Sequence, residues 1–294
     1  DVVVFANRYF GINYVMIYKE KGQDPNEKKI DKPTISPILT NRDKSSDFLR
    51  EIQNSPVKPI EPVFADFKKD LSQAKVKNGI QLLYKNNTLN DIFSIIYLLD
   101  RGSNNDKYLN FAAGYLNLLG TAKMSNSAFN KKMYNLGCSF SVSATEEQTY
   151  IEIYGLSENM EPAMKLVEDL LANAIVNKAT YKTYVQNNIK ERSDQKLNQR
   201  YNFSNLVDYI TYGGQHQKNM LSNEQMQQLN PQTLIDKIHH LFSYQHRILY
   251  YGPASEAETI QAINQMHQVP KVMRNLPQKK KNKKVPTIDN KVYI

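Results

Sequence analysis

The sequence has no tryptophan and only one cysteine among its 294 residues. A single cysteine cannot form an internal disulfide, so it gives no information about the redox compartment. Cys138 follows Gly137 inside an apolar run, which favours a buried structural thiol over a nucleophile. The longest apolar stretches, such as Ile92–Leu99, are far too short to cross a membrane. These absences exclude a disulfide scaffold and a membrane span.

Motifs for catalysis are also missing. Two zinc-binding histidines on a helix must lie three or four residues apart to share a face, whereas His239 and His240 are adjacent and diverge by about 100°. Neither H-E-x-x-H nor H-x-x-E-H occurs, and there is no G-x-S-x-G elbow, P-loop or G-x-G-x-x-G. Surface or packing roles are therefore favoured for the five histidines: His216, His239, His240, His246 and His267.

The charge is unbalanced, with a formal net value of +9. Much of the excess lies in Lys279–Lys284, between Pro277 and Pro286, where a loop is expected. One interpretation is a nucleic-acid-binding surface. The other is a solvated surface with one basic segment, which we favour because no zinc-finger or RNA-binding signature accompanies the lysines.

The chain contains enough apolar residues to form hydrophobic cores: 40% of its residues are hydrophobic, and it has 19 Tyr and 11 Phe. Between residues 76 and 174 the hydrophobic pattern predicts strand, strand, helix, helix, strand, strand, helix. The predicted ranges are 76–83, 91–100, 107–119, 125–136, 138–142, 149–156 and 158–174. This order, with the first two strands as a hairpin, predicts an α+β fold with a mainly antiparallel sheet.

The chain divides into four parts by pattern. Residues 1–22 are a helix and a strand (13–19), expected as the tail of a preceding domain, and residues 23–70 are a proline-rich linker with one short helix at 45–53. Residues 71–177 form a complete domain, and residues 178–294 begin a second, truncated one. The latter is predicted to hold a long helix or helix pair (181–210), a helix (233–242), a strand (246–251), a helix (256–267) and an opening strand (291–294).

A weak internal echo supports a duplicated organisation. Residues 1–19 and 233–251 both consist of a helix, a short turn and an aromatic-rich strand. Phe10 matches Phe242 and Tyr18 matches Tyr250, an offset of 232 residues. The expected meaning is one structural unit that occurs twice.

The stretch Phe93–Ala172 carries a family resemblance. It contains the acidic loop RGSNND, a helix that runs into Leu-Gly-Thr, a Lys/Met/Ser start to the next helix, and YGLSENMEPAMKLVEDLL. In this order and spacing it resembles the repeated domain of the pitrilysin-type metallopeptidases, which carry an inverted zinc motif. The linker IDKPTISPILTNRDKSSDFLREI is similar to the one between the halves of large bacterial members.

The resemblance implies a degenerate, non-catalytic second half. In the family, H-x-x-E-H lies on the helix before the Gly-Thr turn, with two zinc ligands and a general base. Counted back from Gly120-Thr121, these positions hold Phe111, Gly114 and Tyr115. The family's later Glu ligand falls near Glu191, which would be alone. The resemblance therefore implies no zinc and no catalytic residue in this chain, with the zinc in the catalytic half of the parent protein. The family's substrate-binding Arg and Tyr would lie beyond Ile294.

The resemblance thus implies that the chain forms part of the substrate chamber of a zinc metallopeptidase and is inactive by itself. Its partners would be the catalytic N-terminal half of the same polypeptide and a peptide substrate, with a homo-oligomer as a further possibility. Two alternatives remain: a non-catalytic scaffold of the same family, and nucleic-acid binding through Lys279–Lys284. Analogy with bacterial relatives suggests export to the periplasm.

Overall fold

The computed structural model describes residues 2–19, 22, 31–38, 40, 42, 44–214, 218–286, 289–290 and 292. It consists of two units, residues 1–62 and 63–294. The first unit contains α1 (Val2–Tyr9) and α2 (Asp47–Asn54). The second contains β1 (Ser72–Val76), η1 (Lys77–Gly79), β2 (Ile80–Asn86), β3 (Ile92–Leu99), α3 (Leu109–Leu116), α4 (Asn126–Asn135), β4 (Cys138–Ala144), β5 (Thr149–Leu156), η2 (Ser157–Asn159), α5 (Met160–Asn173), α6 (Lys178–Gln195), α7 (Gln199–Tyr212), α9 (Asn223–Gln228), α10 (Gln232–His239), η3 (Leu241–Ser243), β6 (Arg247–Gly252) and α11 (Glu256–Met266).

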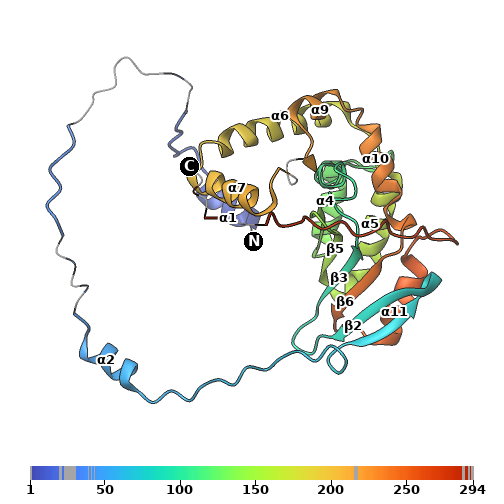
Figure 1. Ribbon diagram of the computed structural model, residues 1–294, viewed down its shortest axis with the longest axis horizontal. Coiled ribbons are helices and arrows are strands. Elements are labelled where there is room, and N and C mark those ends of the chain that lie inside the picture. Colours follow the sequence, from blue (N-terminus) through green and yellow to red (C-terminus); the bar gives the residue numbers. More distant parts are fainter. Residues whose placement is uncertain are drawn as a thin grey trace. The chain divides into compact units, whose positions relative to one another are not determined.

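One six-stranded sheet organises the second unit, in the order β1-β2-β6-β3-β5-β4. Every neighbouring pair is antiparallel except β2 and β6, which run parallel. The predicted α+β class with a mainly antiparallel sheet is confirmed. Figure 1 shows β6 between β2 and β3, although it comes far later in the chain.

The position of β6 corrects two predictions. The hairpin expected between residues 76–83 and 91–100 is wrong, because β2 and β3 both pair with β6 and not with each other. The boundary expected at residues 177/178 is also wrong for the described residues, since β6 completes the sheet that begins at residue 72. Hydrogen bonding across the sheet is a non-local property that the order of hydrophobic segments does not reveal.

The first hairpin of the sheet was missed, although the sequence contains its signal. Asn78 and Gly79 both have positive φ, 59° and 77°, and they connect β1 to β2. An Asn-Gly pair between two strands favours this turn, because both residues tolerate the left-handed region at low cost. The hydrophobic pattern predicts one strand over 76–83, whereas the structure has the end of β1, the turn and the start of β2.

The two faces of the sheet differ in burial. Phe93, Ile95 and Tyr97 of β3 are fully buried on the face that packs against helices. α4 and α5 contact β4 and β5, α3 contacts β4 and α10, and α11 contacts α5 and β1. On the opposite face Ser94 and Ile96 are only half-buried. This face will be called the open face of the sheet.

The helices begin where the sequence predicts. Side chains of Ser125 and Ser255 accept hydrogen bonds from the backbone N–H groups of Ala128 and Glu258, at the N-caps of α4 and α11. Such caps satisfy amide groups that the helix cannot pair internally. The long helix predicted at 181–210 is the pair α6 and α7. Residues 291–294 lie mostly outside the described part of the chain.

The first unit matches the predictions only in part. α1 and α2 are helices as expected, and Ser46 caps α2 by accepting a hydrogen bond from Leu49 N–H. Residues 13–19, predicted as a strand, have no regular secondary structure. Their side chains are exposed: Val15, Ile17 and Tyr18 are 90%, 89% and 77% exposed. A strand needs a neighbouring strand for its backbone hydrogen bonds, and unit 1 supplies none among its described residues.

Candidate functional site

The three positions that the resemblance assigns to a degenerate zinc motif lie together on α3. Phe111, Gly114 and Tyr115 face α6, where Tyr181 and Tyr184 pack against them. The ring centroids of Phe111 and Tyr184 are 4.6 Å apart, and those of Tyr115 and Tyr181 are 5.3 Å apart. We call these four aromatic residues the aromatic plug.

The packing of the aromatic plug requires a residue without a side chain at position 114, which is Gly114. A Cβ atom at this position would lie 2.2 Å from the Tyr184 hydroxyl oxygen, far inside contact distance. The Tyr184 hydroxyl donates a hydrogen bond to the Phe111 carbonyl oxygen at 3.1 Å, so its position is fixed by α3 itself. The side chain of Tyr184 therefore occupies the space into which a glutamate at position 114 would project.

The hydroxyl groups of the plug are fixed and stay protonated. Tyr115 Oη donates to the Asn177 carbonyl oxygen at 2.8 Å and accepts from Asn177 N–H at 3.1 Å. Tyr181 Oη donates to the Met226 carbonyl oxygen at 2.7 Å. Burial raises the pKa of Tyr181 and of Tyr184 to about 12, and it also raises the pKa of Tyr115. None of these groups can act as an anionic metal ligand near neutral pH, so the residues present do not fit a zinc ion.

Glu191 lies on α6, two helical turns beyond Tyr184. It is exposed, and its Oε1 accepts a hydrogen bond from Gln195 Nε2 at 3.1 Å. No group of three or more His, Cys, Asp or Glu side chains suited to a metal ion occurs in the part of the chain that the structure describes. His216 lies outside those residues. The absence of zinc from the chain stays a prediction.

Sequence analysis missed a buried cluster of ionisable side chains. Atom Nε2 of His246 lies 2.8 Å from Nε2 of His267, and Nδ1 of His267 lies 2.6 Å from Oε1 of Glu168. All three side chains are buried, beside the ring of Tyr97. No sequence pattern could have indicated the cluster, because Glu168 and His267 are 99 residues apart. We call these three residues the buried triad.

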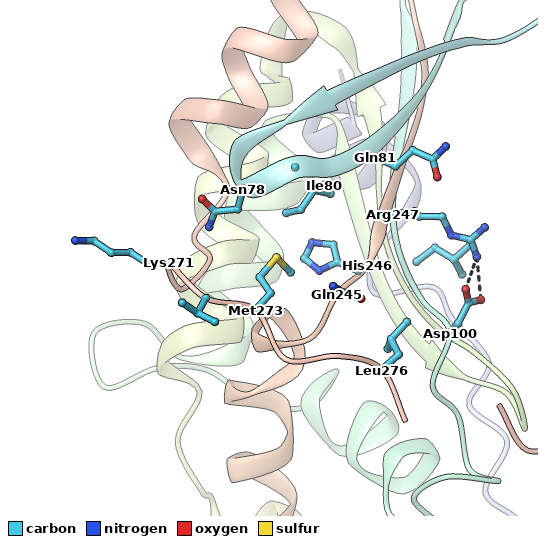
Figure 2. Close-up of a pocket in the computed structure, with 13 residues that line it drawn as sticks. Asn78, Ile80, Gln81, Asp100, Gln245, His246, Arg247, Lys271, Met273 and Leu276 are labelled. Carbon is cyan, nitrogen blue, oxygen red and sulfur yellow. Dashed lines mark hydrogen bonds and ion pairs between the residues drawn. The ribbon is translucent and has the colours of Figure 1, made fainter. Parts of the chain in front are cut away.

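His246, at one end of the triad, lines a cavity of about 540 Å³. Figure 2 shows the His246 ring at its centre, next to Ile80 and Met273. At one side Arg247 Nη2 donates to both carboxylate oxygens of Asp100, each at 2.8 Å. His246 offers the cavity no free nitrogen, because its Nδ1 is 2.8 Å from the Tyr244 carbonyl oxygen. The triad is therefore a structural hydrogen-bond network, and one of its members, His246, forms part of the cavity wall.

The hydrogen bonds determine how many protons the triad holds. Three links connect Glu168, His267, His246 and the Tyr244 carbonyl oxygen, and each link needs one hydrogen. Three protons shared by one carboxyl group and two imidazoles leave the triad electrically neutral. Burial lowers the pKa of His246 to about 4, so His246 is neutral near pH 7. It donates through Nδ1 and accepts at Nε2 from His267.

Stability is expected to fall between pH 6.5 and pH 4. In this window His246 binds a proton in the unfolded chain but not in the folded chain, so acid favours unfolding. The contribution is fully present above pH 6.5 and amounts to about 3 kcal/mol. Urea titrations at several pH values measure the free energy of unfolding.

The matched control for this effect is His246→Phe. This variant keeps a ring next to Tyr97 and Phe242 but has no titratable nitrogen, so its stability should depend less on pH in the same window. The titratable and charged groups near His246 are His267, Glu168, Asp100 and Arg247. Equal pH profiles for the two proteins would contradict the assignment to His246.

The open face of the sheet presents rows of side chains across four strands. The register aligns Leu83, Leu249, Ile96 and Glu152 in one row. The next row contains Lys85, Tyr251, Ser94 and Tyr154, and Glu152 Oε1 accepts a hydrogen bond from Ser94 Oγ at 3.2 Å. Tyr154 and Tyr251 are 49% and 43% exposed. Two rows that combine aliphatic side chains and tyrosines with one lysine and one glutamate suit contact with an extended polypeptide.

The lysine-rich segment packs on the second unit. Lys279 Nζ lies 2.8 Å from Glu147 Oε2, and this carboxylate raises the pKa of Lys279. Asn282 Nδ2 donates to Glu146 Oε2 at 2.6 Å, and Asn104 Nδ2 donates to the Lys280 carbonyl oxygen at 3.2 Å. Acidic neighbours and backbone contacts favour the interpretation as a surface segment over a nucleic-acid-binding one.

The fold is that of peptidase M16 inactive domains and related proteases. A peptidase M16 inactive domain from Pseudomonas fluorescens matches with a TM-score of 0.63 and 17% identity, over 72% of this chain and 53% of that one. The periplasmic protease PqqL from Escherichia coli matches with a TM-score of 0.60 and 13% identity, over 90% of this chain and 29% of that one. A protease from Helicobacter pylori matches with a TM-score of 0.55 and 15% identity, over 73% and 54%.

The likeness rests on structure alone. No protein-family model matches the chain, and no curated protein sequence matches it either. The chain spans about half, or less, of the length of the solved structures that it matches. No helix among the described residues is long and apolar enough to cross a membrane.

Proposed function

We propose that this chain is a zinc-free, non-catalytic half of a larger M16-type peptidase. The aromatic plug is the observation that carries the proposal. The family's zinc-motif positions on α3 hold Phe111, Gly114 and Tyr115, and hydrogen bonds of the plug join this helix to Tyr184 of α6 and to Asn177, the N-cap of α6. A site that had only lost its ligands would retain space for a metal, whereas this one is packed with side chains. The role left to the chain is structural and substrate-binding.

The open face of the sheet is the surface proposed to line the substrate chamber. Leu83, Ile96 and Leu249 can contact apolar side chains of a peptide, while Tyr154 and Tyr251 add polar hydroxyls. The chain would thereby position a substrate that the catalytic half cleaves, which lowers the barrier through orientation. The partner half, the peptide substrate, the zinc of that half and an exported location are all parts of this proposal. Matches to halves of larger proteases, one of them periplasmic, support it.

The purified chain is expected to contain less than about a tenth of an equivalent of zinc after mild dialysis, because a site with two His and a Glu would hold the metal tightly. Elemental analysis measures the zinc, and the same preparation should not hydrolyse fluorogenic peptides. Near one equivalent would contradict the proposal. The double variant His239→Ala/His240→Ala then tests whether these exposed histidines are the ligands.

A further inference from the structure

The first unit exposes an unusual amount of apolar surface. Val2, Phe10 and Tyr18 are 84%, 79% and 77% exposed, and the large apolar side chains between them are exposed as well. Single exposed apolar residues are normal, but a contiguous series of this kind marks a surface that is covered by something else. The internal echo with residues 233–251 indicates what covers it.

Burial in the second copy identifies the core positions of the repeated unit. Eight residues between 233 and 251 are buried in α10, η3, β6 and the residue before β6, and they alternate in the strand as a one-faced strand requires. They are Leu234, Ile235, Ile238, Leu241, Phe242, His246, Ile248 and Tyr250.

The same register in the first copy gives only apolar or aromatic residues. Shifted by 232 positions, the eight core positions become Val2, Val3, Ala6, Tyr9, Phe10, Tyr14, Met16 and Tyr18. In this alignment, the polar residues and the glycine of the first copy correspond to residues that are not buried in the second copy. These residues are Asp1, Asn7, Arg8, Gly11, Asn13 and Lys19. The first copy thus has the apolar pattern of a buried helix and strand, although its large apolar side chains are exposed.

The second copy also shows how the strand of such a unit is held. β6 lies inside the sheet, with β2 parallel on one side and β3 antiparallel on the other. Every residue of β6 from Arg247 to Tyr251 has a partner in β2 on one side and a partner in β3 on the other. The sheet of this chain therefore has no vacant place for another strand between β2 and β3.

We infer that residues 2–18 form the closing helix–strand unit of a second domain with this same sheet topology. In that domain Val15–Lys19 would be the internal strand, between one parallel and one antiparallel neighbour, with Met16 and Tyr18 directed into its core. The occupant of the exposed surface is thus a related domain whose sheet lacks this strand. The inference deepens the proposed function, because that domain would belong to the partner half.

A segment exchange tests the fit directly. In the full chain, residues 233–251 are replaced by a copy of residues 1–19, which has the same length. The chimera is expected to unfold in a single cooperative thermal transition, because its apolar residues meet every core position. Circular dichroism and calorimetry measure the transition. A smaller exchange, Val15–Lys19 in place of residues 247–251, tests the strand alone if the helix packs poorly.

Matched substitutions in the inserted copy test the register. Met16→Thr with Tyr18→Thr alters the two core-facing positions and should abolish the cooperative transition. Val15→Thr with Ile17→Thr introduces the same residue at two open-face positions and should retain it. Equal effects of the two pairs, or loss of the transition in both exchanges, would overturn the inference.

Hydrogen exchange on the unaltered chain provides an independent measurement. The amides of Tyr14–Tyr18 should exchange as fast as those of an unfolded peptide, since their partner strands lie in the other domain. Slow exchange at these amides would show that the strand is already paired within this chain or between two copies, and would also overturn the inference. None of these readouts depends on zinc content, so failure here is distinguishable from failure of the proposed function.

Discussion

The triple substitution Phe111→His, Gly114→Glu and Tyr115→His is expected to unfold the chain and to recruit no zinc, although it rebuilds the H-x-x-E-H motif. A side chain at position 114 collides with Tyr184, whose hydroxyl lies 2.2 Å from the new Cβ atom. Loss of Tyr115 removes two hydrogen bonds to Asn177 and leaves a void between α3 and α6. Together these changes should cost about 5 kcal/mol or more, comparable to the whole stability of an average domain.

Circular dichroism and zinc analysis together check this expectation. Phe111→Leu is the control, because it keeps an apolar side chain on α3 and should cost only about 1 kcal/mol. Addition of Tyr184→Ala to the triple variant removes the colliding ring and should recover part of the fold. A triple variant that folds and binds one equivalent of zinc would show that the aromatic plug does not block the site.

The substitution His267→Ala is expected to destabilise the chain by about 3–5 kcal/mol. It leaves the Glu168 carboxyl group buried with one remaining donor, Gln268 N–H at 3.2 Å, and it removes the hydrogen bond that Nε2 of His246 accepts. It also opens a void beside Tyr97, whose ring centroid is 4.8 Å from that of His267. Urea unfolding at pH 7.5 measures the loss.

His239→Ala is the matched control for this substitution. His239 is exposed and makes a single hydrogen bond, to the Ala174 carbonyl oxygen at 3.0 Å, so its removal should cost about 1 kcal/mol or less. A double replacement of Glu168 and His267 by leucine should be less damaging than His267→Ala alone, since no buried carboxyl group is then left without its histidine partner. A His267→Ala variant as stable as the control would mean that the triad contributes little to the fold.

Local features of the fold were predictable from the sequence, and pairings between distant segments were not. The serine N-caps, the row of buried apolar residues along α5 and the alternating burial of residues in β5 all follow from the spacing of residues within a single helix or strand. The insertion of β6 between β2 and β3 depends on contacts between segments far apart, which a single sequence does not display. The Asn78-Gly79 turn was readable and was missed, because the apolar residues around it suggested one continuous strand.

The same distinction holds for the candidate site. The positions Phe111, Gly114 and Tyr115 could be assigned from motif spacing, since they lie on one helix before the Gly120-Thr121 turn. The tyrosines that fill the space around them come from α6, and the packing of that helix against α3 is a long-range contact that residue spacing does not reveal. The buried triad joins α5 to the residues at the ends of β6 and α11, and was likewise beyond sequence reasoning.

The late position of β6 in the chain has a consequence for synthesis on the ribosome. β3 ends at Leu99, but the strand that joins it to β2 begins only at Arg247. Until that segment emerges from the ribosome, β2 and β3 each have one edge whose backbone groups lack a partner strand. Residues such as Leu82, Phe93 and Ile95 also lack part of their final packing. Such edges attract other chains, and long-range strand pairing is slow. The interval between Leu99 and Arg247 is therefore the stage of synthesis at which this protein most needs protection from aggregation.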